Sequence, residues 1–242
     1  MNIGTSEIDI TPKPGVELSG FAARTQPSIG ILDPLFAKAL YLVDGHERLL
    51  WLHCDLVGVD HAVVAAFRRW ADEKLGLAPD QVMISATHTH AGACTIHLQE
   101  AGEYDAEYVE FLQDRLRSVT RAAMARTEHV DLVAVEGVLD LAVDRRKTAS
   151  AHTDPRVAAF GFRRSQGGFA AVVVNYAMHP VGLGASNRLI SADYPGQTAQ
   201  VLAGQLPGKP IVLVTNGACA NLNPPAEDVP FERISAWGRQ VA

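Results

Sequence analysis

The sequence has few cysteines, no long apolar run and no basic leader. Its three cysteines (Cys54, Cys94 and Cys219) are far apart and form no CxxC pair, so a disulfide framework is not indicated. We therefore expect a reducing, cytoplasmic setting. A stretch of about 18 apolar residues is absent, which argues against a membrane-spanning helix. The N-terminus has no basic segment followed by an apolar run, so it does not resemble a signal peptide.

An excess of positive charge is also missing. Lys and Arg number 21 against 27 for Asp and Glu, which gives a formal net charge of -6. Because proteins that bind nucleic acid through its phosphates are usually basic, we expect no nucleic-acid partner. The 242 residues are 48% hydrophobic and 20% charged, as in a globular protein with a sizeable core. No repeat or flexible linker divides the sequence, so we predict one domain over residues 1–242.

Strand and helix patterns alternate along the chain. Helical spacing of apolar residues predicts helices over 60–75 and 105–126, a third from Asp193 or Tyr194, and a fourth from near Phe231. This mixture predicts a single α/β domain in which mixed β-sheets are sandwiched by helices. Short apolar runs predict the strands, at 2–11, 37–43, 49–57, 81–85, 130–139, 157–164, 169–177 and 211–215.

The final predicted helix reaches Ala242 without a capping residue. We interpret this as a chain cut within a helix. On that interpretation Ile234, Trp237 and Val241 form an apolar face without a partner in the chain, which predicts self-association into a homo-oligomer.

Three histidines follow short apolar strands. His88 and His90 are two residues apart, so in an extended segment their imidazoles point the same way. His179 follows another apolar strand and precedes Pro180. Sites in α/β proteins gather beyond the carboxyl ends of strands, and three imidazoles suit a catalytic zinc ion. We therefore predict that His88, His90 and His179 converge on one metal ion; the alternative is that they are unrelated loop histidines.

Other polar residues have two interpretations each. His53 lies inside a strand and is expected in the core. Asp193 could orient a ligating histidine or cap the following helix. Cys219 could be a thiolate nucleophile, a soft metal ligand or simply a small buried residue.

Motifs spread over nearly the whole chain resemble the N-terminal domain of the neutral/alkaline (non-lysosomal) ceramidase family. Two of them contain the three histidines: Thr87-His88-Thr89-His90 and Asn175-Tyr176-Ala177-Met178-His179-Pro180. The others are Asp9-Ile10-Thr11-Pro12, Gly20-Phe21, Asp33-Pro34-Leu35, Asp55-Leu56-Val57-Gly58, Asp144-Arg145-Arg146, Ile190-Ser191-Ala192-Asp193-Tyr194-Pro195-Gly196 and the segment from Asn216 to Pro224.

The resemblance implies a zinc-dependent amidase. One histidine of the pair, together with His179, would bind zinc, and a Glu and a Tyr further along the family's chain would complete the shell. We assign His88 as the ligand and His90 as the acid/base, and the reverse assignment stays open. Zinc would polarise the amide and activate water, and Arg145 would help to hold the site.

Two departures from the family pattern change the expected function. Ceramidases carry a required serine where this sequence has Asn223, which can donate a hydrogen bond but cannot be a nucleophile. Asn221 stands where relatives usually have Asp. We therefore predict a small amide, such as an N-acyl compound, rather than ceramide as the substrate.

The chain also ends before the family's distal Glu and Tyr. We expect the 242-residue chain alone to be a poor hydrolase. Two alternatives remain: a non-catalytic remnant domain that binds metal weakly, and a cysteine hydrolase that uses Cys219.

Overall fold

The computed structural model describes residues 1–146 and 148–242. Its helices are α1 (His61–Leu75), α2 (Ala106–Ala125), α3 (Asp193–Gln205) and α4 (Phe231–Val241), with a short 3-10 turn at Pro79–Gln81. Its strands are β1 (Asn2–Asp9), β2 (Gly30–Ile31), β3 (Phe36–Asp44), β4 (Glu47–Cys54), β5 (Val82–Ala86), β6 (Glu128–Val138), β7 (Val143–Asp144), β8 (Arg156–Arg164), β9 (Phe169–Tyr176), β10 (Leu189–Ile190), β11 (Ile211–Asn216) and β12 (Leu222–Asn223). The predicted α/β class is confirmed.

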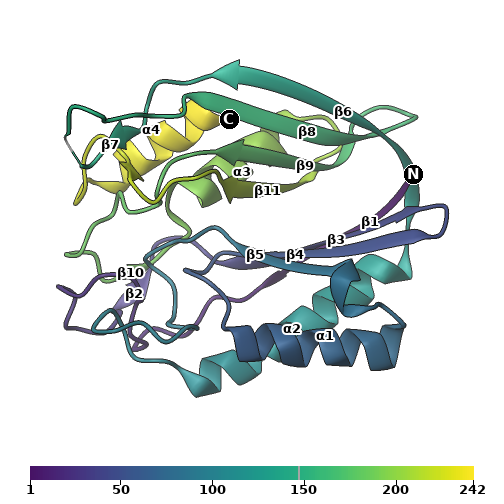
Figure 1. Cartoon of the computed structure of the whole chain (residues 1–242), viewed down its shortest axis with the longest axis horizontal. Helices are drawn as coiled ribbons and strands as arrows, with labels where there is room; N and C mark the ends of the chain where they lie inside the picture. Colours follow the sequence, from purple (N-terminus) through teal and green to yellow (C-terminus); the bar gives the residue numbers. More distant parts are fainter. Residues whose placement is uncertain (147) are drawn as a thin grey trace.

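One large sheet folds over on itself. Within the described residues it holds 8 strands in the order β11-β9-β8-β6-β1-β3-β4-β5. Strand β1 pairs with β6 only at Asn2↔His129 and Ile3↔Glu128, and the sheet bends at this narrow junction. The two halves then lie face to face, with α1 and α2 outside one half and α3 and α4 outside the other (Figure 1). The result is a four-layer sandwich of helices, half-sheet, half-sheet and helices.

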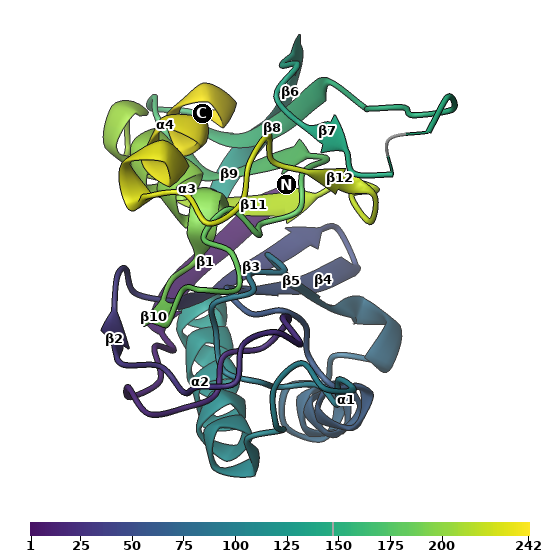
Figure 2. The same cartoon turned by 90° about the vertical axis from the view of Figure 1, so that its left-hand side faces the viewer.

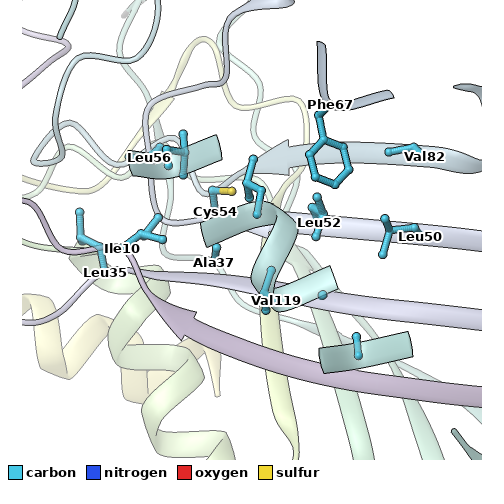
Figure 3. Packing of buried hydrophobic residues seen from close by; sticks show 14 of the residues in the cluster. Ile10, Leu35, Ala37, Leu50, Leu52, Cys54, Leu56, Phe67, Val82 and Val119 are labelled. Carbon is cyan, nitrogen blue, oxygen red and sulfur yellow. The ribbon is translucent and has the colours of Figure 1, made fainter. Parts of the chain in front are cut away.

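The first half follows closely from local sequence signals. Strands β3 and β4 form an antiparallel hairpin around Gly45, whose φ of 59° is accessible to glycine at little cost. The Asp60 carboxylate caps α1 by accepting from the Ala62 N–H, and Gly76 ends that helix with a φ of 64°. Helices α1 and α2 bury apolar side chains against the strands, and Figure 3 shows Phe67 of α1 and Val119 of α2 within this buried cluster.

The space between the two halves holds its own small core. Leu40 of the first half packs with Val173 and Leu213 of the second. Two buried polar side chains also cross it: Lys38 Nζ donates to the Val212 carbonyl at 2.8 Å, and His53 Nε2 lies 3.0 Å from the Val214 carbonyl. Strand β11 is a sheet edge, so these bonds satisfy carbonyls that no strand pairs with. The prediction that His53 is a core histidine is confirmed.

The predicted uncovered face of the last helix is wrong. Ile234, Trp237 and Val241 are 0%, 3% and 4% exposed, because α4 packs against α3 and the loop at Gly182. Large exposed apolar side chains lie instead on β6, at Leu132, Val135 and Val138. Self-association stays a prediction, but the buried face of α4 no longer supports it.

None of the helices formed by the described residues is long and apolar enough to cross a membrane.

Candidate metal centre

The three predicted histidines lie where the two half-sheets meet. His88 follows β5, the last strand of one half, and His179 follows β9 in the other half. Figure 2 shows these ends of β5, β9 and β11 on the side that faces the viewer. The Asn216 amide at the end of β11 donates to the Thr87 carbonyl at 2.6 Å, so the second half-sheet contacts the chain directly before His88.

Backbone bonds fix both histidine loops. The His88 N–H donates to the Leu56 carbonyl at 2.8 Å, and the His179 N–H donates to the Leu222 carbonyl at 2.8 Å. His88 has a φ of 66°, which is unusual for a residue other than glycine. Such backbone conformations persist where the surroundings impose them, and they are frequent at functional sites.

The imidazoles converge on one point. Nε2 of His90 lies 3.4 Å from Nε2 of His88 and 3.1 Å from Nε2 of His179. One ligand nitrogen from each of the three histidines lies within 4.8 Å of the others. The structure therefore brings together all three residues that the sequence singled out.

Burial favours neutral rings at His90 and His179, and a hydrogen bond orients the ring of His88. Nδ1 of His88 lies 2.6 Å from the Val57 carbonyl, so it carries the proton and leaves the lone pair on Nε2. Burial lowers the pKa of His90 to about 3, with His179 and His88 adding repulsion. Burial and His88 also lower the pKa of His179 to about 4. A neutral imidazole has one N–H and one lone pair, so near neutral pH His90 and His179 can each offer one nitrogen lone pair to a metal ion.

This arrangement fits zinc. A tetrahedral zinc ion with nitrogens at about 2.0–2.1 Å separates its ligand atoms by about 3.3–3.4 Å. The separations of 3.4 Å and 3.1 Å at His90 agree with that value to a few tenths of an ångström. Nδ1 of His90 and Nδ1 of His179 are buried and have no hydrogen-bond partner within the described residues. No strong hydrogen bond therefore fixes the proton on Nε2 of these two rings, and Nε2 can carry the lone pair that a metal ion needs.

A cavity of about 550 Å³ opens beside the cluster. His88 and His179 line it, together with Arg145 and Cys219, whereas His90 lies behind them and does not. The rest of the lining comes from the ends of β5 and β11 and from the loop after β4, at Val57, Gly58, Val59, Ile84, Ser85, Ala86, Thr215, Asn216 and Ala220.

The two neighbouring arginines have different surroundings. Arg146 forms an ion pair with Asp144 at 2.6 Å. The Arg145 N–H donates to the Asn221 carbonyl, and its side chain lines the cavity. The Asn221 amide in turn donates to Asp144 at 2.9 Å, a bond that an ionised Asp at position 221 could not make.

Asn223, Asp193 and Asp55 are not among the residues that line the cavity. The Asn223 amide donates to Glu227 at 2.7 Å. The Asp193 carboxylate accepts from the Leu183 and Tyr194 N–H groups, but Ala192 is the N-cap of α3 and no side chain caps that helix, so the capping interpretation is not supported. Asp55 accepts from the Phe36 N–H at 2.9 Å.

Sequence reasoning missed several residues that support the cluster. The Tyr194 hydroxyl donates to the Met178 carbonyl at 2.6 Å and lies 3.2 Å from Oδ1 of Asn216. Phe21 packs its ring against His90, with centroids 5.0 Å apart. Arg24 donates to the His90 carbonyl at 2.7 Å. Tyr194, Asn216 and Phe21 lie in the segments that carry the family resemblance, but no pattern in the sequence indicated Arg24.

The fold and the histidine cluster together define an α/β protein with a candidate three-histidine metal centre. The family model described as neutral/alkaline non-lysosomal ceramidase, N-terminal, matches residues 1–211. The chain belongs to this family.

Two solved structures are similar over 99% of the chain, with a TM-score of 0.88 and 21% sequence identity. One is the neutral ceramidase from Pseudomonas aeruginosa, and the other is described as a ceramidase complexed with C2. The matched region is 43% and 42% of those chains, so this chain spans less than half of their length.

Proposed function

We propose that this protein is a zinc-dependent hydrolase of an amide, with an N-acyl compound as substrate. The observation that supports this most directly is the convergence of His88, His90 and His179 through Nε2 atoms beside an open cavity. Family membership supports the hydrolase class.

His88, His90 and His179 would hold the zinc ion. Nδ1 of His88 lies beside the Val57 carbonyl, which leaves Nε2 free to face the metal. Burial, and then repulsion from neighbouring histidines, lowers the pKa of His90 and of His179 and so disfavours their protonation. When bound, zinc would polarise the amide carbonyl and lower the pKa of water. The position of His90 behind the other two supports a ligand role for it, and its acid/base role stays a prediction.

Arg145 would bind and orient the substrate. Arg145 lines the cavity, and a guanidinium can donate to a carbonyl or carboxylate oxygen of an N-acyl compound. Asn223 is less directly placed, because its amide is bonded to Glu227 and would have to leave that partner to reach a substrate. Because this chain matches less than half of the similar ceramidase chains, we also propose that the 242-residue domain alone is a poor hydrolase.

A cysteine hydrolase has less support. Cys219 lines the cavity, but burial raises the pKa of its thiol. A thiol that stays protonated near neutral pH is a weak nucleophile.

The test combines metal analysis with an activity screen. The purified 242-residue chain and its His179→Ala variant are titrated with zinc and assayed on a panel of N-acyl amides. His61→Ala serves as the control, because that histidine is exposed at the start of α1. We expect about one zinc per chain, lost in His179→Ala and kept in His61→Ala. Equal zinc binding by all three proteins would refute the proposed site. Complete absence of hydrolysis in the zinc-loaded wild type, as opposed to slow hydrolysis, would favour the remnant-domain alternative.

A further inference from the structure

Arg24 is bonded to three separate loops at the back of the histidine cluster. Its Nη1 donates to the His90 carbonyl at 2.7 Å and also lies near the carbonyls of Leu18 and Ser19, at 3.4 Å and 3.3 Å. Its Nη2 donates to the Gly184 carbonyl at 3.0 Å. One guanidinium therefore links three segments that are far apart in the sequence.

The Gly184 contact connects Arg24 to the second histidine loop. The Val181 N–H donates to the His179 carbonyl at 3.0 Å, and the Gly184 N–H donates to the Val181 carbonyl at 3.0 Å. These successive turns relay the position of Gly184 to His179. Arg24 consequently fixes the His90 loop and the His179 loop relative to each other.

The ring of His90 is oriented by packing. Phe21 meets it edge-on, with centroids 5.0 Å apart and planes at 68°. The Arg24 guanidinium lies over the Phe21 ring, 5.0 Å from its centroid. Metal-bound histidines usually donate their second N–H to a carbonyl or carboxylate, which fixes the ring. Nδ1 of His90 has no such bond of good geometry within the described residues, although the Gly20 backbone lies beside it, so packing by Phe21 and the backbone held by Arg24 help to orient this ring.

We propose that Arg24 and Phe21 are positioning residues that together hold His90 and His179 at the spacing needed to share one metal ion. This inference rests on the proposed metal-binding function. The planar fork of an arginine suits the role, because it can donate to two carbonyls from a fixed geometry, whereas a lysine offers a single ammonium group. Neither Arg24 nor Phe21 lines the cavity, so they act through the histidines.

The test measures zinc affinity by competition with a chelator, for Arg24→Lys, Phe21→Leu and the full wild-type chain. Arg68→Lys is the matched control. Arg68 also donates from Nε and Nη2 to a carbonyl, that of Val82, but at the opposite end of β5 from His88. Loss of groups that orient metal ligands typically weakens binding by about 10–100-fold. We expect a loss in that range for Arg24→Lys, a smaller loss for Phe21→Leu, and a change within about twofold for Arg68→Lys.

A second readout separates positioning from general stability. The visible spectrum of the cobalt-substituted protein reports the geometry around the metal, and urea unfolding reports the stability of the fold. We expect an altered spectrum in Arg24→Lys and an unaltered one in Arg68→Lys, even where the two lose similar stability. Should Arg24→Lys fail to fold, Phe21→Leu decides alone, since it removes no hydrogen bond.

The possible failures are distinguishable. If His179→Ala loses zinc but Arg24→Lys keeps wild-type zinc affinity, the metal site stands and the positioning role is overturned. If Arg24→Lys does not fold, wild-type affinity in Phe21→Leu overturns that role in the same way. Equal losses in Arg24→Lys and Arg68→Lys would overturn it as well, because a general weakening of the fold would explain both. Wild-type affinity in His179→Ala would refute the metal site itself.

Discussion

Gly20 offers a direct test of the packing around His90. Its φ is 100°, and an added Cβ would lie 2.9 Å from Cε1 of the His90 ring and closer still to Nδ1 and Cγ. Carbon atoms in contact prefer about 3.5–4.0 Å, so in Gly20→Ala the ring must retreat by more than about 0.6 Å. A metal–ligand distance tolerates a change of only about 0.2 Å. In Gly20→Ala, His90 should therefore no longer reach the proposed metal ion.

Gly15 provides the control for backbone strain. Its φ of 110° is close to that of Gly20, but an added Cβ meets no atom within 4 Å. Both alanine variants should lose about 1–2 kcal/mol of folding free energy, because a side chain disfavours this backbone region. Only Gly20→Ala has the additional clash with His90.

The assay is zinc competition with a chelator beside urea unfolding of each protein. We expect Gly20→Ala to bind zinc about 10–100-fold more weakly than wild type and Gly15→Ala to bind within about threefold of it. If both variants bound zinc equally well, the ring of His90 would not be held where the structure places it, and the argument from packing would fail.

Three further outcomes are expected. Burial, then the Lys38 charge, lowers the pKa of His53 to about 3, so its contribution to stability is complete above pH 6.5 and is lost as the pH falls toward 3. The free energy of unfolding, measured in urea at pH 7, 6 and 5, should therefore fall less steeply with falling pH in His53→Gln than in wild type, by up to about 1.4 kcal/mol per pH unit. Burial raises the pKa of Asp193 to about 6, an effect of opposite sign between pH 3.8 and 6 that is common to both proteins and cancels in their difference. Trp237→Ala should cost about 3–5 kcal/mol of unfolding free energy, and the half-buried Trp70→Ala clearly less; equal losses would contradict the packing of α4. Cys219→Ala should keep wild-type zinc affinity and any amide hydrolysis, and loss of hydrolysis alone would revive the cysteine mechanism.

Local signals in the sequence predicted the elements well. Asp60 and Gly76 mark the ends of α1 because capping depends on a few adjacent residues. The site was predictable for a related reason. Histidines that closely follow strands lie beyond the carboxyl ends of those strands, where sites gather, and His88 and His179 follow β5 and β9 in this way.

The contacts between distant segments were not predictable in this way. The sheet bends where β1 pairs with β6 through two residue pairs, and no hydrophobic periodicity in the sequence indicates this pairing. The cover over Trp237 comes from α3 and Gly182, which are far from α4 in the sequence, so its face looked unpartnered from the sequence alone. Arg24 gave no signal, because a single arginine in a polar loop is most often solvated.

The candidate metal centre depends on the polar bonds that join the two half-sheets. His88 and His90 belong to one half and His179 to the other, so their spacing is only as fixed as the contact between the halves. Lys38 and His53 bond to carbonyls along β11, which sets the position of that strand against β3 and β4. Asn216 continues this series to the Thr87 carbonyl, directly beside His88. The same buried groups that satisfy a sheet edge thus determine whether three imidazoles can reach one ion, which is why residues remote from the cavity are expected to change metal affinity.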